Sequence, residues 1–191
     1  MIYKTDEITV RKLEKEDEQL LVAWLSDPQV LQFYEGRDRP HDLEMVREHF
    51  YVDDELHRCV FEFAGKPIGY IQFYPLEKEF RRKYGYLNKD EKIYGMDQFI
   101  GETKYWDQGI GKKLGKSMIE HLTNREKIDK IAMDPQTWNE RAIACYEKCG
   151  FKKIKRLKEH EKHEGRYRDC WLMEYSREFS CSINLRKRVK N

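Results

Sequence analysis

The chain has 191 residues, which is enough for one well-buried domain and short for two. Its 37 basic and 35 acidic residues leave a net charge of only +2, so the overall charge does not favour nucleic acid as a partner. The sequence shows no signal-peptide pattern and no apolar stretch of membrane length, which argues against a membrane partner and predicts a cytoplasmic protein. The five cysteines are odd in number and lack framework spacing, so free thiols are expected.

Apolar periodicity predicts the elements of the first half of the chain. They are, in order, a strand at residues 7–13, a helix at 14–25, an irregular aromatic segment at 30–39, a helix at 42–51 and strands at 59–63 and 67–74. Ser26-Asp27-Pro28 ends the first helix, and Gly65-Lys66 predicts a tight hairpin turn between the last two strands.

Residues 76–92 form a long, charged segment without a clear period. Hairpin loops are normally about 2–5 residues long, so a connection of this length is unusual. Two interpretations are open: a solvated excursion, or a mobile flap over a substrate cleft.

The second half is predicted to hold a strand at 96–101, a helix at 109–124, a strand at 127–134, a helix at 139–149 and strands at 151–157 and 169–175, with a charged loop at 158–166. Strands and helices mix without strict βαβ alternation. The predicted fold class is therefore α/β of the α+β type, with a mixed, largely antiparallel twisted sheet flanked by helices in a single domain. The domain is assigned to residues 1–176, followed by a basic C-terminal tail at 177–191.

Two features near the middle of the chain are unusual. Asp97 interrupts the apolar run of residues 96–100, where aspartate is disfavoured. Downstream, Gly109 and Gly111 open a helix whose first N–H groups are free to hold a phosphate. The segment matches neither a Walker loop nor a dinucleotide fingerprint, and alone it is compatible with plain turn chemistry.

A second segment gives these glycines a more specific meaning. Residues 139–151 have the pattern Asn, two residues, Ala, three residues, Tyr, three residues, Gly-Phe. Together the two segments resemble the acetyl-CoA-binding core of the GNAT acetyltransferases. Residues 94–101, Met133-Asp134-Pro135 and the segment from Asn139 onward are similar to the aminoglycoside 6'-N-acetyltransferases in particular. A thinner similarity, which includes residues 33–38 and 159–161, runs from Ile8 to Tyr175.

The resemblance implies a GNAT-like fold and an enzyme that transfers acetyl from acetyl-CoA to the 6'-amine of an aminoglycoside. The amine would attack the thioester directly, and no metal is expected. The cofactor-binding residues that the resemblance implies are Phe99, Ile100, Gln108, Gly109, Ile110, Gly111, Lys112, Lys113, Asn139, Ala142 and Tyr146. Trp106 stands where the family pattern usually has Arg or Gln, which affects a side-chain contact but not the cradle of backbone amides.

Asp97 is predicted to order the substrate amine and to take its proton, directly or through water; the alternative is a sheet aspartate paired with a nearby Lys or Arg. By resemblance, Tyr146 donates a proton to the CoA sulfur, and the alternative is a packed core tyrosine. Asp134 is predicted to bind a cationic amine, or else simply to form a turn before Pro135. The predicted substrate-binding residues are completed by Tyr34, Glu35 and Asp38.

Other functions are open at this point. One is a GNAT acetyltransferase of another small cationic amine or of a protein N-terminus, and another is a non-catalytic acetyl-CoA-binding module. The cluster at residues 160–164 lacks His-Glu-x-x-His spacing and is predicted to be a solvated loop rather than a metal site. The protein is expected to be a monomer or a homodimer.

Overall fold

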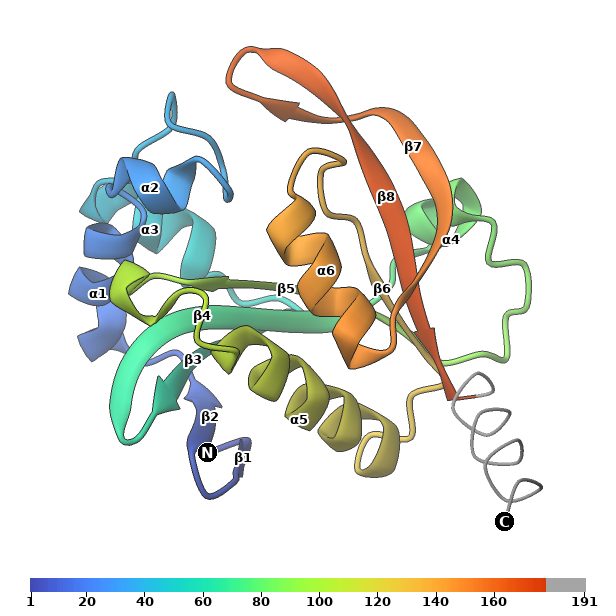
Figure 1. Ribbon diagram of the computed structural model, residues 1–191, viewed down its shortest axis with the longest axis horizontal. Helices are drawn as coiled ribbons and strands as arrows, with labels where there is room; N and C mark the ends of the chain where they lie inside the picture. The colour runs from blue at the N-terminus through green and yellow to red at the C-terminus, as the bar shows by residue number, and fades with distance from the viewer. Residues whose placement is uncertain (178–191) are drawn as a thin grey trace.

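The computed structural model describes residues 1–177, and within them eight strands form one sheet in the order β1-β2-β3-β4-β5-β6-β8-β7 (Figure 1). The strands are β1 (Tyr3–Lys4), β2 (Ile8–Lys12), β3 (His57–Phe63), β4 (Lys66–Pro75), β5 (Ile93–Ile100), β6 (Lys130–Met133), β7 (Lys152–His163) and β8 (Arg166–Ser176). The α-helices are α1 (Glu18–Trp24), α2 (Pro28–Leu31), α3 (Leu43–Phe50), α4 (Lys78–Tyr84), α5 (Ile110–Asn124) and α6 (Glu140–Cys149). Neighbouring strands are antiparallel except β5 and β6. The predicted mixed, largely antiparallel sheet flanked by helices is confirmed.

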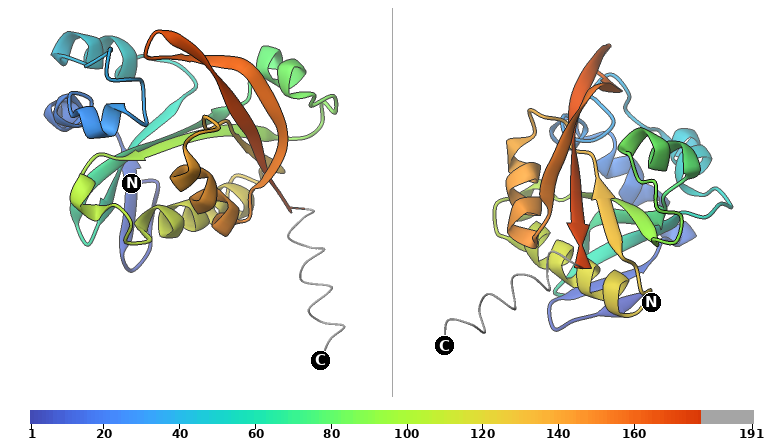
Figure 2. Two further views of the ribbon diagram at one scale, coloured as in Figure 1. Left: turned by 45° about the horizontal axis from the view of Figure 1, so that its top comes forward. Right: turned by 90° about the vertical axis from the view of Figure 1, so that its right-hand side faces the viewer.

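Helices cover both faces of the sheet (Figure 2). On one face, α1, α2 and α3 place Leu21, Val30 and Val46 in a cluster with Tyr70 of β4 and Phe99 of β5. On the other face, α5 and α6 cover a larger cluster that extends from β2 to β8. No helix among residues 1–177 is long and apolar enough to cross a membrane.

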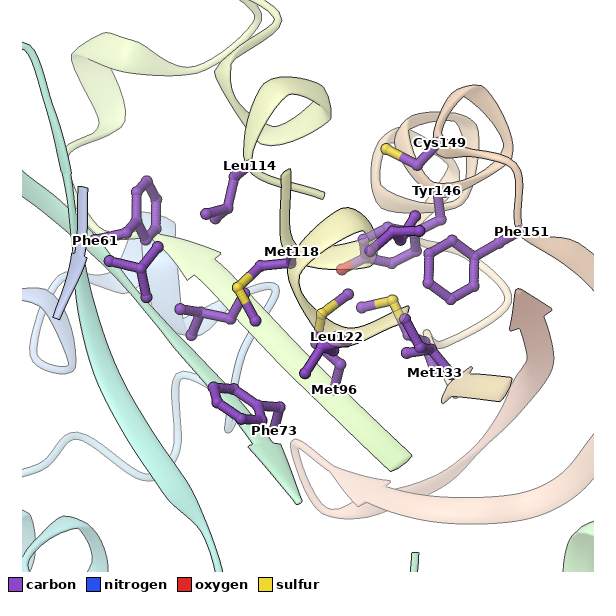
Figure 3. Close-up of a cluster of buried hydrophobic side chains, with 14 of the residues drawn as sticks. Phe61, Phe73, Met96, Leu114, Met118, Leu122, Met133, Tyr146, Cys149 and Phe151 are labelled. Atoms are coloured by element: carbon purple, nitrogen blue, oxygen red, sulfur yellow. The ribbon is translucent and has the colours of Figure 1, made fainter. Parts of the chain in front are cut away.

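The larger cluster ties α5 and α6 to each other and to the sheet (Figure 3). Apolar residues of α5 recur at helical spacing and face the sheet, as expected for an amphipathic helix. The two helices lie close together, because a Cβ at Gly115 would be 2.8 Å from Cys149 Sγ and one at Gly111 would be 3.4 Å from Cys145 Sγ. This pairing places the first turn of α5 beside the middle of α6.

β5 and β6 pair over a short distance and then separate. Their parallel register joins Ile93, Tyr94 and Gly95 to residues 130–132. β5 continues along β4 as far as Ile100, whereas β6 ends at Met133 shortly before Pro135, which has no N–H for a sheet ladder. The second half of β5 therefore faces a gap instead of a neighbouring strand on that side.

Three local differences separate the structure from the sequence predictions. Residues 76–92, which show no period, contain the two-turn helix α4, and Gly85 ends it with φ +86°. The prediction of a loop at residues 158–166 was wrong, because β7 and β8 run through it and turn only at Glu164-Gly165. This hairpin projects from the sheet (Figure 1), so many of its residues are polar on both faces and lack the expected alternation. The β3–β4 turn lies at Ala64-Gly65, one residue earlier than predicted.

Residues 178–191 of the predicted basic tail lie outside the described residues. The assignment of a tail therefore stays a prediction.

Gly69 of β4 offers a test of the packing between β3 and β5. A Cβ at this position would overlap the carbonyl oxygen of Phe99 and the ring of Phe61. Because Phe61 is fully buried, Gly69→Ala is expected to lower the free energy of unfolding by about 1–3 kcal/mol, as overpacked cores do. Urea denaturation measures this change. An unchanged midpoint would mean that the ring and the strand can move apart without cost.

Candidate active site

The gap between β5 and β6 opens into a cavity of about 1000 Å³. Consecutive residues of β5 from Asp97 to Ile100 all line this cavity, and successive strand residues point to opposite faces of a sheet. The cavity therefore reaches both faces at the point where the two strands separate. Its volume is at the upper end of the range of about 300–1,000 Å³ that is typical of small-molecule sites.

Most of the predicted site residues meet in this cavity. Those that line it are Tyr34, Glu35, Asp97, Phe99, Ile100, Gly109, Ile110, Gly111, Lys112, Asp134, Asn139, Ala142 and Tyr146. Three others do not line it. The Gln108 side chain donates to the carbonyl of Lys104, Lys113 pairs with Glu7 at 2.6 Å, and Asp38 is exposed to solvent.

Asp97 is held by two neutral donors from β4. Gln72 Nε2 donates to Asp97 Oδ2 over 2.8 Å, and the Tyr74 hydroxyl donates to the same oxygen over 3.0 Å. Cross-strand pairing explains the first contact, because Gln72 lies directly opposite Asp97 in the β4–β5 register. Oδ1 accepts no hydrogen bond from residues 1–177 and is available to a ligand. The partners are thus neutral, unlike the Lys or Arg of the alternative interpretation.

The surroundings of Asp97 change its acidity. Burial and the nearby charge of Asp134 raise the pKa of Asp97 to about 6, although the donors Gln72 and Tyr74 lower it. A carboxyl group with this pKa is ionised at neutral pH, yet it is a stronger base than an exposed aspartate. This is the range in which a general base works best.

Asp134, just beyond the end of β6, has the opposite environment. Its Oδ2 accepts from the Tyr84 hydroxyl over 2.8 Å and from His160 Nε2 over 2.7 Å. Burial raises the pKa of this carboxyl, but the hydrogen bonds from His160 and Tyr84 outweigh burial and hold the pKa below its ordinary value. Tyr84 belongs to α4, and Phe80 and Lys83 of the same helix line the cavity, so the segment 76–92 contributes to its wall.

The sequence analysis missed His160 and Glu161 of β7. Both line the cavity, and only 5% of the His160 side chain is exposed, so the prediction of a solvated loop was wrong here too. Burial raises the pKa of Glu161, and the charge of Asp134 adds to the effect. The family resemblance of residues 159–161 was the signal that pointed to these two residues. The charged composition of the segment favoured a solvated loop instead. Among residues 1–177, no group of three or more His, Cys, Asp or Glu is arranged to hold a metal ion.

The start of α5 forms the opposite end of the cavity. Gly109 is the N-cap and has φ +76°, a left-handed conformation that glycine adopts without strain. No side chain caps this helix, so its first N–H groups are free toward the cavity. The helix dipole and Lys112 add positive potential at the same place. This arrangement suits a phosphate group.

Residues at the start of α6 form another part of the cavity wall. Asn139 caps the helix, because its side chain accepts from the N–H of Ala142 over 3.2 Å. Tyr146 lies one turn further along, and only 7% of it is exposed. Burial raises the pKa of the Tyr146 phenol, so the group stays protonated. Its hydroxyl makes no hydrogen bond with residues 1–177 and can donate to a ligand in the cavity.

Residues after α2 form the last wall. Tyr34 packs on Phe99 with ring centres 4.6 Å apart, and Glu35 pairs with Arg39 at 3.4 Å. The tip of the β7–β8 hairpin reaches this wall, because Arg37 Nη2 donates to Glu164 Oε2 over 2.8 Å. Figures 1 and 2 show the hairpin arching toward the α2 region.

Comparison with known proteins identifies the family of the chain. Residues 14–158 match the model of the acetyltransferase (GNAT) domain. The chain belongs to the GNAT acetyltransferase family. It is therefore an acetyl-CoA-dependent N-acetyltransferase, as predicted from the sequence, and its fold is the expected GNAT fold.

The chain is similar to acetyltransferases of two kinds of amine. An aminoglycoside N(6')-acetyltransferase type 1 of Klebsiella pneumoniae is 28% identical over 152 residues, which cover 78% of this chain and 75% of that protein. A structure of AAC(6')-Ib in complex with paromomycin and acetyl-CoA superposes with a TM-score of 0.71 and 25% identity, and the match covers 91% of this chain and 96% of that one. A spermine/spermidine N(1)-acetyltransferase of Bacillus subtilis is 31% identical over 110 residues, which cover 57% of this chain and 65% of that protein.

The two carboxyl groups of this GNAT site give a test by pH. If Asp97 acts as a base, kcat/KM falls as the pH drops through about 6, because the protonated carboxyl cannot accept a proton. The charge of Asp134 contributes to the raised pKa of Asp97. Asp134→Asn keeps the size of the side chain but removes this charge, so the acidic limb of the profile is expected to move to lower pH.

The measurement is kcat/KM against pH for both proteins with the same amine, so that the titration of the amine cancels in the comparison. Identical acidic limbs in the two pH profiles would show that the charge of Asp134 does not affect the pKa of the group that titrates.

Proposed function

We propose that the chain transfers the acetyl group of acetyl-CoA to the 6'-amine of an aminoglycoside. The observation that carries this proposal is one cavity that joins the free N–H groups at the start of α5 to the half-buried carboxylates Asp97 and Asp134. An acyl donor with a phosphate tail fits the first end, and a polycationic acceptor fits the second. The similarity to aminoglycoside N(6')-acetyltransferases supports this choice of acceptor.

In the proposed reaction, Asp97 performs the proton transfer. Its free Oδ1 accepts a hydrogen bond from the substrate ammonium, while Gln72 and Tyr74 hold Oδ2. The Asp97 carboxylate takes one proton from the ammonium, directly or through water, and the neutral amine then attacks the thioester carbonyl. Asp97 releases that proton to solvent. A C–N bond forms, the C–S bond breaks, and the second amine proton leaves through Asp97 and, by way of solvent, replaces the proton that Tyr146 gives to the sulfur.

Tyr146 serves the leaving group. The buried phenol stays neutral and donates to the sulfur as the C–S bond breaks, so that CoA leaves as a thiol. The backbone edge of β5 that faces the gap lies beside this position, and its Phe99 and Ile100 line the cavity. Amide groups along such an edge can pair with the amides of the pantetheine arm and can stabilise charge on the thioester oxygen.

Asp134, Glu161 and Glu35 are assigned to the remaining amines of the acceptor. Each lines the cavity, and Asp134 is held below its ordinary pKa, so it carries full charge at neutral pH. The neighbouring ring of Tyr34 offers a flat apolar surface to a sugar ring. Several carboxylates at fixed, separate places suit a rigid polyamine with several ammonium groups.

A second candidate is acetylation of a linear polyamine. The similarity to a spermine/spermidine N(1)-acetyltransferase supports it, and the chemistry at Asp97 would be the same. The two acceptors differ in width. We favour the aminoglycoside because the cavity has a volume of about 1000 Å³ and is lined by the aromatic rings of Phe33, Tyr34 and Trp138, which can pack against sugar rings that a linear polyamine lacks.

The deciding experiment incubates the protein with acetyl-CoA and a panel of amines and follows the release of free thiol. The panel contains a kanamycin-type aminoglycoside, spermidine, a lysine derivative and a peptide N-terminus. Release with the aminoglycoside is expected, and NMR of the product should place the acetyl group on the 6'-nitrogen. Release with spermidine alone would refute the aminoglycoside proposal and support the second candidate.

Asp97→Asn tests the assignment of the base. The amide keeps the contact with Gln72 but cannot take a proton, so kcat is expected to fall by about 10²–10⁴-fold while the KM for acetyl-CoA changes little. Asp6→Asn is the matched control, because Asp6 is exposed and does not line the cavity. Asp6→Asn should turn over at the wild-type rate. Wild-type turnover by Asp97→Asn would remove Asp97 from the mechanism.

A further inference from the structure

Arg141, in the first turn of α6, lies between two aromatic rings on the wall of the cavity. Its guanidinium carbon is 4.0 Å from the centre of the Trp106 ring and 4.4 Å from that of Phe33. The Trp106 ring is itself fixed, because Nε1 donates to the carbonyl of Ile100 over 2.8 Å. Stacking on aromatic faces therefore holds the guanidinium in one place.

The fold does not use the charge of Arg141. None of the carboxylates of residues 1–177 pairs with it, and its N–H groups donate no hydrogen bond within that part of the chain. A guanidinium has five donors in a rigid fork that matches the geometry of a phosphate. Arg141 thus presents a fixed, unpaired cation to the cavity.

The neighbours of Arg141 indicate which ligand it takes. Trp106, on which Arg141 stacks, shortly precedes Gly109 in the chain, and Gly109, Gly111 and Lys112 at the start of α5 line the same cavity. Asp107 also lines the cavity in this part but forms no ion pair with Arg141. Two Lys or Arg side chains and free helix N–H groups attract an anion and repel a cationic amine. The ligand is therefore an anionic part of the donor and not the acceptor.

We propose that Arg141 binds a phosphate group of acetyl-CoA and supplies the side-chain contact that Trp106, whose Nε1–H is donated to Ile100, does not make. Trp106 does not bind the anion but orients the guanidinium that does. This inference rests on the acetyl-CoA site of the proposed function. Acetyl-CoA carries phosphate in the pyrophosphate and at the ribose 3' position, and the experiment distinguishes these two sources.

The test compares the wild type with Arg141→Ala and Arg141→Lys. Calorimetry gives the Kd for CoA and for dephospho-CoA, which lacks the 3'-phosphate. Initial rates with acetyl-pantetheine, which has no phosphate, give a phosphate-independent reference. Arg125→Ala is the matched control, because it removes the same charge just beyond the far end of α5 at an exposed residue that does not line the cavity. Thermal melting of each variant shows that it is folded.

Arg141→Ala is expected to raise the Kd for CoA by about tenfold or more, the usual effect of losing a charge-assisted hydrogen bond. Its rate with acetyl-pantetheine should equal that of the wild type, and Arg125→Ala should leave the Kd for CoA unchanged. The Kd of Arg141→Lys for CoA should lie between those of the wild type and Arg141→Ala, because lysine keeps the charge but not the planar stack. If the 3'-phosphate is the ligand, Arg141→Ala and the wild type should bind dephospho-CoA with the same Kd. If the pyrophosphate is the ligand, Arg141→Ala should bind dephospho-CoA more weakly than the wild type does.

Two results would overturn the proposal. An unchanged Kd for CoA in Arg141→Ala would show that the residue binds no phosphate. An equal loss of rate with acetyl-pantetheine would show that Arg141 only supports the wall at Phe33. These affinities need no acceptor. If the wild type acetylated no aminoglycoside, the proposed acceptor would fall, while the affinities for CoA would still decide the role of Arg141.

Discussion

The separation of β5 from β6 is the constraint on which the site depends. Parallel pairing stops after Gly95, while β5 continues along β4 to Ile100. A strand without a neighbour on one side exposes backbone N–H and C=O groups that need partners. The gap also lets side chains from both faces of β5 line one cavity. The base that binds the amine, on one face, and the acetyl-CoA site, on the other, can therefore act together. A sheet that was paired along its whole length would keep these groups apart.

The two carboxyl groups at the gap show how the fold gives the same side-chain type two roles. Asp97 receives hydrogen bonds from neutral donors and is mainly affected by burial, which raises its pKa to about 6. Asp134 receives hydrogen bonds from His160 and Tyr84, which outweigh burial and lower its pKa. One group is thus poised to exchange a proton, and the other stays charged. The charge on Asp134 also helps to raise the pKa of Asp97, so the two assignments support each other.

Much of this arrangement could be predicted from local sequence. Asp97 in an apolar run, the glycines that open α5 and the Asn139 cap each have a local physical reason, and all of them line the cavity. His160 and Glu161 had no such local reason, because their places in the cavity depend on distant residues: His160 contacts Asp134, 26 residues away, and Glu161 contacts Gln136. The charged hairpin that carries them has no alternation to show a strand. The position of Arg141 likewise depends on rings from two other segments. Long-range contacts of this kind leave no local pattern.

The distribution of charge along the cavity explains why the composition said so little about partners. Carboxylates from β5, the end of β6 and β7 surround one end, whereas Lys112 and Arg141 lie at the other, beside the start of α5. The net charge of +2 is a sum over the whole chain and does not show these two groups, yet each creates a local potential of its own sign. An anionic donor and a cationic acceptor can therefore be drawn to different ends of one cavity. Since the thioester must lie between them, the same separation of charge that selects the two substrates also brings the amine and the acetyl group together at the gap in the sheet.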